Sequence, residues 1–168
     1  MNPLPPPLGT GALVFWRLDL AKHASTWNSG EGSFRVGGRW NSKGIRAVYA
    51  ALDPATAILE VAVHKTFKAL DTVKHVLTSA RIVDAKHVHV VPSIPNPNWL
   101  NPGTLSAGQQ LFGNTLLKTH PFVLFPSVVS KHSWNVVFDS TAVHGLFTDV
   151  TQEDFALDPR LTSSRTAR

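Results

Sequence analysis

The sequence predicts a single α+β domain, and three observations lead to this prediction. The 168 residues fit one domain of ordinary size. Hydrophobic residues make up 43% of the chain and charged residues 16%, a balance typical of globular proteins. Short apolar runs of strand length alternate with two segments of helical pattern, without any repeat. We expect residues 1–11, which include four prolines, to form a disordered leader, and residues 12–168 to form the domain.

The first half of the chain predicts two strands and a helix. Residues 12–18 form a short apolar run that indicates a mostly buried strand. Residues 22–46 are rich in Gly, Ser and Asn, which indicates a long functional loop. Residues 48–51 indicate a brief second strand. Asp53-Pro54 suits the N-cap and first position of a helix, whose body we expect over residues 55–67.

The second half predicts more strands around a second helix. Residues 73–91 are rich in Val and Ile and indicate two strands that meet near Asp84. Residues 92–102 hold four prolines and three asparagines and indicate a surface loop. Residues 105–118 have the spacing of an amphipathic helix. Its expected apolar face consists of Leu105, Leu111, Phe112 and Leu116. The remaining apolar runs are 122–129 and 134–138, which indicate adjacent strands, and 155–157, which indicates a last short strand.

The composition limits the classes of function. The chain has no cysteine, which excludes disulfides and thiolate chemistry. No apolar run approaches the ~20 residues of a membrane span, and the N-terminus lacks the charged-then-apolar order of a signal peptide. We therefore expect a soluble, cytoplasmic protein without membrane contact. The net charge of +5 suits an anionic ligand. Because the basic residues are scattered singly, direct nucleic-acid binding is not expected.

Glu60 is a lone carboxylate among apolar neighbours in the first predicted helix. Its burial would be costly, so it either points to solvent or lines a cleft, and both interpretations remain open. Arg17 and Arg39 each offer a planar guanidinium suited to phosphate, although Arg17 could instead pair with a core acid. Gly37-Gly38 would let a pyrophosphate approach the backbone, although such a pair commonly marks a turn.

Polar side chains in the strand-like runs form a second group of candidates. Tyr49, the only tyrosine, could stack on a heterocycle or fill the core. Ser127 needs a hydrogen-bond partner, but it lacks the Gly-x-Ser-x-Gly context of a hydrolase nucleophile. Asn135 could cap, bridge or contact a ligand. His87 and His89 have plausible metal spacing, but no third ligand of matching pattern follows, so no metal site is expected.

Taken together, these residues resemble the RES domain family, whose members are the toxin partners of Xre-type antitoxins in bacterial toxin–antitoxin pairs. The match covers nearly the whole chain and consists of six short motifs in the family's order. The motifs are Phe15-Trp16-Arg17, Gly38-Arg39-Trp40-Asn41 with Gly44, Val48-Tyr49-Ala50, Ala57 to Glu60 with Val61 and His64, Pro126-Ser127-Val128-Val129 with Asn135, and Asp158-Pro159-Arg160-Leu161.

The resemblance implies a fold similar to that of ADP-ribosyltransferases, with split mixed or antiparallel sheets and a few helices. It implies that NAD+ is a substrate, cleaved by water or with phosphate as co-substrate, that no cofactor or metal takes part, and that an Xre-type antitoxin blocks the NAD+ cleft. Glu60 would stabilise the positive charge left on the ribose. The resemblance also places Arg17 and Ser127 at the catalytic centre. Arg17 and Arg39 would bind the pyrophosphate, and Tyr49 would stack on the nicotinamide. Ser127 and Asn135 would contact the ribose or the amide, and Gly38 would form part of the cleft wall.

Two other functions stay open at this point. A mono-ADP-ribosyltransferase would use the same site but would pass ADP-ribose to a protein. A non-enzymatic module would bind nucleic acid or a protein partner, and salt-sensitive nucleic-acid binding would then survive the loss of Glu60. Of these functions, the resemblance favours a growth-arresting toxin that degrades NAD+.

Overall fold

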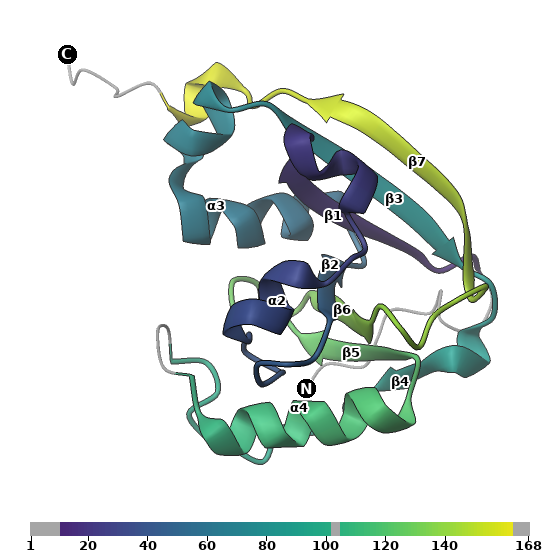
Figure 1. Ribbon diagram of the computed structural model, residues 1–168. Helices are drawn as coiled ribbons and strands as arrows, with labels where there is room; N and C mark the ends of the chain where they lie inside the picture. The colour runs from purple at the N-terminus through teal and green to yellow at the C-terminus, as the bar shows by residue number, and fades with distance from the viewer. Residues whose placement is uncertain (1–10, 102–104, 163–168) are drawn as a thin grey trace.

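A seven-stranded mixed sheet organises the computed structural model, which describes residues 11–101 and 105–162. The strands are β1 (Val14–Leu20), β2 (Ala47–Ala51), β3 (His75–Ile82), β4 (Val88–Val90), β5 (Phe122–Pro126), β6 (Trp134–Asp139) and β7 (Phe147–Phe155). Their order across the sheet is β4-β5-β6-β2-β1-β3-β7 (Figure 1). β4 and β5 run parallel, and the other neighbouring pairs are antiparallel. The predicted α+β class is confirmed.

Two long helices accompany the sheet, as predicted. They are α3 (Pro54–Thr72) and α4 (Ala107–Thr119), and the shorter helical segments are α2 (Glu31–Val36), η1 (Ala21–Thr26), η2 (Ala85–His87) and η3 (Pro159–Leu161). The start of α3 follows its sequence signal, because the Asp53 side chain accepts a hydrogen bond from the Thr56 amide and Pro54 takes the first helical position. The helix is interrupted at Thr66, where φ is 69°, close to its predicted end.

The sheet has a narrow junction between β1 and β2, which we call the seam. β1 pairs with β3 along its whole length, and β2 pairs with β6 in the same way. In contrast, β1 and β2 share a single residue pair, Trp16 with Ala51. The seam divides the sheet into a first half, β1-β3-β7, and a second half, β2-β6-β5-β4. The resemblance implied split mixed or antiparallel sheets, and the structure has one mixed sheet whose two halves meet at the seam.

Helices α3 and α4 cover the same face of the sheet, on either side of the seam (Figure 1). The core under α3 contains Leu18, Ala62, Leu70 and Leu77. The core under α4 contains Trp40, Val91, Leu117, Val123, Phe125 and Val137. The opposite face of the sheet carries a third core, which includes Phe15, Trp27, Val48, Val136 and Phe138.

Three expectations about elements need correction. Residues 22–46 are not one long loop, because they contain most of η1 and all of α2 before a turn. The last strand is the nine-residue β7, whereas we expected residues 155–157; it is an exposed edge strand and therefore lacks an apolar pattern. In α4, Leu111 is 65% exposed and the buried residues include Gln109 and Asn114, so its buried face is more polar than predicted.

Other expectations stand as follows. Residues 1–10 of the expected leader lie outside the described residues. Within the described part of the chain, no helix is both long and apolar enough to cross a membrane. The surface loop expected at 92–102 contains turns and bends, and no helix or strand, over its described residues 92–101.

Candidate active site

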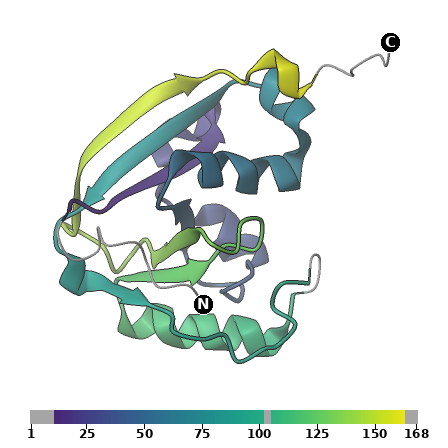
Figure 2. The same cartoon turned by 180° about the vertical axis from the view of Figure 1, so that it is seen from behind.

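Glu60 is half-buried on α3, and its side chain is hydrogen-bonded by two residues from the second half of the sheet. Its Oε1 atom accepts hydrogen bonds from Ser127 Oγ and from Asn135 Nδ2, both at 2.8 Å. Ser127 follows the end of β5, and Asn135 lies on β6. The loop between these two strands reaches α3 on the back of the molecule as seen in Figure 2. Of the two interpretations that the sequence left open, the structure therefore excludes a Glu60 that simply points to solvent.

Ser127 fixes the carboxylate through a hydroxyl group that both donates and accepts a hydrogen bond. The residue is completely buried, and its Oγ donates to Glu60 while accepting from the Ser130 amide at 3.2 Å. The Ser127 amide donates to the Ser133 carbonyl and closes the turn of the hairpin. Because the hydroxyl proton points to a carboxylate, Ser127 is suited to positioning Glu60.

Two oxygen atoms of Glu60 and Asn135 have no hydrogen-bond partner among the described residues. Both hydrogen bonds to Glu60 reach Oε1, so Oε2 has no hydrogen bond to any residue that the structure describes. Asn135 Oδ1 is buried and has no partner, although its Nδ2 is used. A buried acceptor without a partner is costly unless water or a ligand donates to it. We call Glu60, Ser127 and Asn135 the carboxylate cluster.

Residues 37–42, which we call the arginine loop, form a turn that Tyr49 holds in place. The turn is closed by a hydrogen bond from the Gly38 amide to the Asn41 carbonyl. The Tyr49 hydroxyl accepts from the Trp40 amide at 3.0 Å and donates to Asn41 Oδ1 at 2.7 Å. A Cβ atom at position 38 would lie 2.6 Å from Tyr49 Oη, so only glycine permits this approach. Burial raises the pKa of the Tyr49 phenol above its ordinary value, which keeps the donated proton in place at neutral pH.

Helix α4 supports the arginine loop from the other side, which the sequence did not reveal. Gln110 Nε2 donates to the Gly38 carbonyl at 2.8 Å. Asn114 accepts from the Ser42 amide and donates to the Ser42 hydroxyl. Gly113 lies against the Trp40 carbonyl so closely that a Cβ atom would approach its oxygen to 1.9 Å. The only sequence signal was the presence of polar and small residues on a helix face that was expected to be apolar.

Arg39 has the features of a residue that binds an anion. Its Nη1 donates to the Trp99 carbonyl at 2.9 Å, and the half-buried guanidinium has no carboxylate partner among the described residues. Tyr49 pairs with Val137 and Ala51 with Asn135, so Tyr49 and Asn135 are diagonal neighbours on the same face of adjacent strands. Such neighbours lie about 7–8 Å apart. The arginine loop and the carboxylate cluster therefore border the same region.

Arg17 is engaged at the seam instead. Its Nη1 donates to the Tyr49 carbonyl at 2.6 Å, and its Nη2 pairs with Asp19 at 2.8 Å. Because side chains alternate along a strand, Arg17 shares the face of Phe15, whereas Trp16 and Leu18 pack beneath α3. The structure thus brings Glu60, Ser127 and Asn135 together and places Tyr49 on the strand next to Asn135. Gly38 and Arg39 lie in the loop that the Tyr49 hydroxyl contacts, and Arg17 has a structural pairing.

The histidine pair considered as a metal site has another arrangement. The His89 ring stacks on His120 with ring centroids 4.1 Å apart, and His87 lies in η2. Over residues 11–101 and 105–162, no group of three or more His, Cys, Asp or Glu side chains is placed to hold a metal ion.

A family model and two curated relatives indicate one family, and a solved structure shares the fold. The RES domain model matches residues 14–160. A curated Pseudomonas putida protein named Toxin Res is 29% identical over 154 residues, which cover 89% of this chain and 99% of that protein. Toxin Res of Yersinia enterocolitica is 42% identical over 53 residues, covering 31% of this chain and 34% of that protein. A chain in the crystal structure of the M. tuberculosis MbcT-MbcA toxin-antitoxin complex has the same fold, with a TM-score of 0.69 at 19% identity over 86% of this chain and 85% of that chain.

Proposed function

The chain belongs to the RES domain family, and from this we propose that it is the toxin of a toxin–antitoxin pair that cleaves the bond between nicotinamide and ribose in NAD+. Two curated relatives carry the name toxin, and a structural relative was solved in a toxin–antitoxin complex. The observation that carries the catalytic part of the proposal is Glu60, a carboxylate with one oxygen fixed and the other open.

The proposed reaction needs a fixed negative charge beside the ribose. When the bond between ribose C1′ and the nicotinamide nitrogen breaks, its electron pair leaves with nicotinamide, which becomes neutral, and positive charge develops on the ribose. Glu60 Oε2 would stabilise that charge or accept a ribose hydroxyl hydrogen bond. Ser127 and Asn135 would keep the carboxylate in place, so that little reorganisation is needed during the reaction.

The groups around Glu60 suit the rest of the dinucleotide. The Arg39 guanidinium, which lacks an acidic partner among the described residues, would bind the pyrophosphate. The buried Asn135 Oδ1 would accept a hydrogen bond from the ribose or from the nicotinamide amide. We leave Arg17 out of the pyrophosphate site because its guanidinium already binds Asp19 and the Tyr49 carbonyl. NAD+ is consumed as the substrate, and the proposed steps use no further cofactor.

The acceptor completes the balance of the reaction. Water would add its oxygen to C1′ and release a proton, which gives ADP-ribose. Phosphate would instead form a bond from one of its oxygens to C1′, which gives ADP-ribose 1″-phosphate. Transfer to a protein nucleophile would make the chain a mono-ADP-ribosyltransferase, an outcome that the experiment below distinguishes.

We further propose that an Xre-type antitoxin inhibits the chain by covering the region between the arginine loop and the carboxylate cluster. The support is membership of the RES domain family and the structural relative, which was solved in a toxin–antitoxin complex. We propose no direct contact with nucleic acid, because the sixteen Lys and Arg residues are scattered along the sequence.

The test is incubation of the purified protein with NAD+, with and without phosphate, followed by identification of the products. We expect nicotinamide release, with a loss of at least about a hundredfold in Glu60→Gln and about ten- to a hundredfold in Ser127→Ala. Ser130→Ala is the matched control, because the Ser130 side chain pairs with Ser133 and not with Glu60; it should keep nearly full activity. Release of nicotinamide by Glu60→Gln at the wild-type rate, or by neither protein, would refute the proposal. Label transfer to a macromolecule would instead favour ADP-ribosylation.

A further inference from the structure

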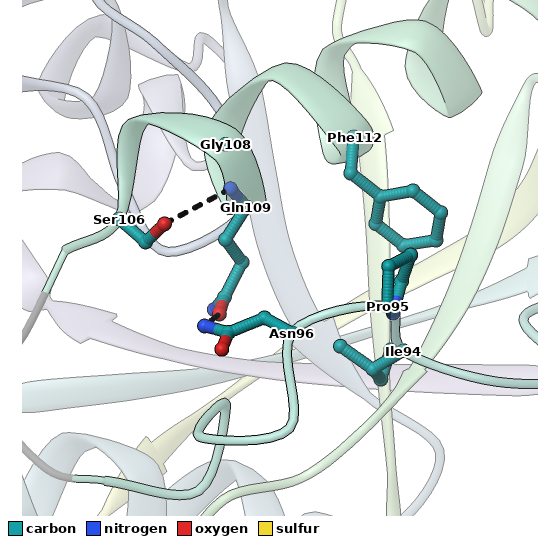
Figure 3. Close-up of a pocket in the computed structure, with 7 residues that line it drawn as sticks. All are labelled: Ile94, Pro95, Asn96, Ser106, Gly108, Gln109 and Phe112. Atoms are coloured by element: carbon teal, nitrogen blue, oxygen red, sulfur yellow. Dashed lines mark hydrogen bonds between the residues drawn. The ribbon is translucent and has the colours of Figure 1, made fainter.

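A pocket of about 340 Å³ lies between the start of α4 and the loop that follows β4. It is lined by Ile94, Pro95, Asn96, Ser106, Gly108, Gln109 and Phe112 (Figure 3). In the figure, the Gln109 and Asn96 side chains meet at one end, and Phe112 lies beside Pro95 and Ile94 at the other. The pocket therefore has a polar end and an apolar wall, and its volume is within the range of small-molecule sites.

The polar end contains a hydrogen-bond donor without a partner. Gln109 is 3% exposed, and its Oε1 accepts from Asn96 Nδ2 at 2.9 Å. Its Nε2 is buried and has no hydrogen bond. Leaving such a donor unpaired costs about 1–3 kcal/mol, so an acceptor atom on a bound molecule would be stabilising. Neutral amide donors beside an apolar wall suit a flat heterocycle with ring-nitrogen acceptors.

The pocket is built from the same two segments that hold the arginine loop. Gln110, the residue after Gln109, donates to the Gly38 carbonyl. Trp99, in the same loop as Asn96, accepts from Arg39. The pocket is therefore bordered by the two segments that bind Arg39 and Gly38, which suits the next chemical group of a ligand whose phosphates bind Arg39.

We propose that this pocket binds the adenine of NAD+, with the Gln109 amide donating to a ring nitrogen and with the base lying against Phe112 and Pro95. The inference rests on the proposed function, since it assigns the second half of the same substrate. Gln109 would then determine the preference for a dinucleotide over a nicotinamide mononucleotide, and it would act far from the bond that breaks.

The test compares nicotinamide release from NAD+ and from nicotinamide mononucleotide, which lacks the adenosine. We expect Gln109→Leu to lose about tenfold in kcat/KM on NAD+, the value of one hydrogen bond, with no change on the mononucleotide. Gly108→Leu should act in the same way by filling the pocket, because only Ser106 Oγ, at 3.7 Å, lies near a Cβ atom there. Ala107→Leu is the matched control, since Ala107 is exposed and outside the pocket lining; it should leave both substrates unaffected.

Each outcome separates the two proposals. An equal loss on both substrates, or an unchanged ratio in Gly108→Leu, would overturn the adenine site while leaving NAD+ cleavage intact. Release from neither substrate by the wild type would refute the proposed function itself. Calorimetric titration with adenosine monophosphate then measures binding to the pocket without catalysis. Weaker binding to Gly108→Leu than to Ala107→Leu supports the site, and equal binding contradicts it.

Discussion

The Tyr49 hydroxyl is the clearest example of one group that holds a functional segment. It accepts a hydrogen bond from the Trp40 amide and donates one to the buried Asn41 side chain, so it binds two consecutive residues of the arginine loop. The missing Cβ atom at Gly38 makes room for the phenol. We interpret Tyr49 as the residue that sets the position of Arg39, a role that needs the hydroxyl as well as the ring.

Tyr49→Phe separates the hydroxyl from the ring. We expect the free energy of unfolding to fall by about 1–3 kcal/mol, because Asn41 Oδ1 and the Trp40 amide lose their partner. We also expect KM for NAD+ to rise, because Arg39 is no longer held. Chemical denaturation and steady-state kinetics measure the two effects, and Thr115→Ala, which removes an exposed hydroxyl on α4, is the control. Wild-type kinetics in Tyr49→Phe would show that only the ring matters.

The sequence located most site residues, but it could not show how they pair. The apolar neighbours of Glu60 indicated a carboxylate in need of partners, and Ser127 and Asn135 were candidates for other reasons. Their meeting depends on sequence separations of 67 and 75 residues, which only the sheet order decides. For Arg17 the sequence left open both phosphate binding and pairing with a core acid, and the structure shows the pairing with Asp19 and with a backbone carbonyl.

At the scale of elements, the position of α4 in the sequence was predicted correctly, but the face that it buries was predicted wrongly. Its extent matched the amphipathic spacing, but its buried side includes Gln109, Gly113 and Asn114. These residues contact the arginine loop and the proposed adenine pocket, so contacts with neighbouring loops override the hydrophobic pattern. β7 was missed for a related reason, since an edge strand with exposed side chains gives no apolar signal.

Two glycines on α4 test this packing. Gly113→Ala should lower the free energy of unfolding by about 2–3 kcal/mol, because a Cβ atom would lie 1.9 Å from the Trp40 oxygen and the helix would have to move. It should also weaken NAD+ cleavage by displacing the arginine loop. A Cβ atom in Gly108→Ala on the same helix would meet only Ser106 Oγ, at an ordinary contact distance of 3.7 Å, so this variant should stabilise by up to about 0.5–1 kcal/mol. Thermal unfolding of both variants measures this, and equal effects would contradict the close contact.

For the whole molecule, the seam is the feature that relates stability to the site. The two halves of the sheet share one backbone pair there, and side chains provide the remaining links. Arg17 reaches from β1 to a carbonyl of β2 on one face. Glu60, on the helix that packs against the first half, binds two residues of the second half on the other face. The carboxylate cluster is thus both a candidate catalytic group and a link between the halves.

Arg17→Met tests the structural side of this arrangement. We expect the free energy of unfolding to fall by about 2–4 kcal/mol, because Asp19, which is 12% exposed, keeps a buried charge without its partner. Arg81→Met is the matched control, since Arg81 pairs with Asp149 at the surface and should lose less than about 1 kcal/mol. Urea denaturation compares the two variants. A raised KM for NAD+ with unchanged stability in Arg17→Met would instead assign Arg17 to the substrate.

The seam also has a consequence for the time at which activity can arise during synthesis. The chain crosses it from β1 to β2, from β2 to β3, from β3 to β4, and again from β6 to β7. Neither half is therefore a continuous segment, and no early fragment contains a complete half of the sheet. Glu60 leaves the ribosome well before Ser127 and Asn135, so a nascent or truncated chain that ends before Ser127 carries a carboxylate without either partner. The proposed activity would thus arise only after most of the chain has been made.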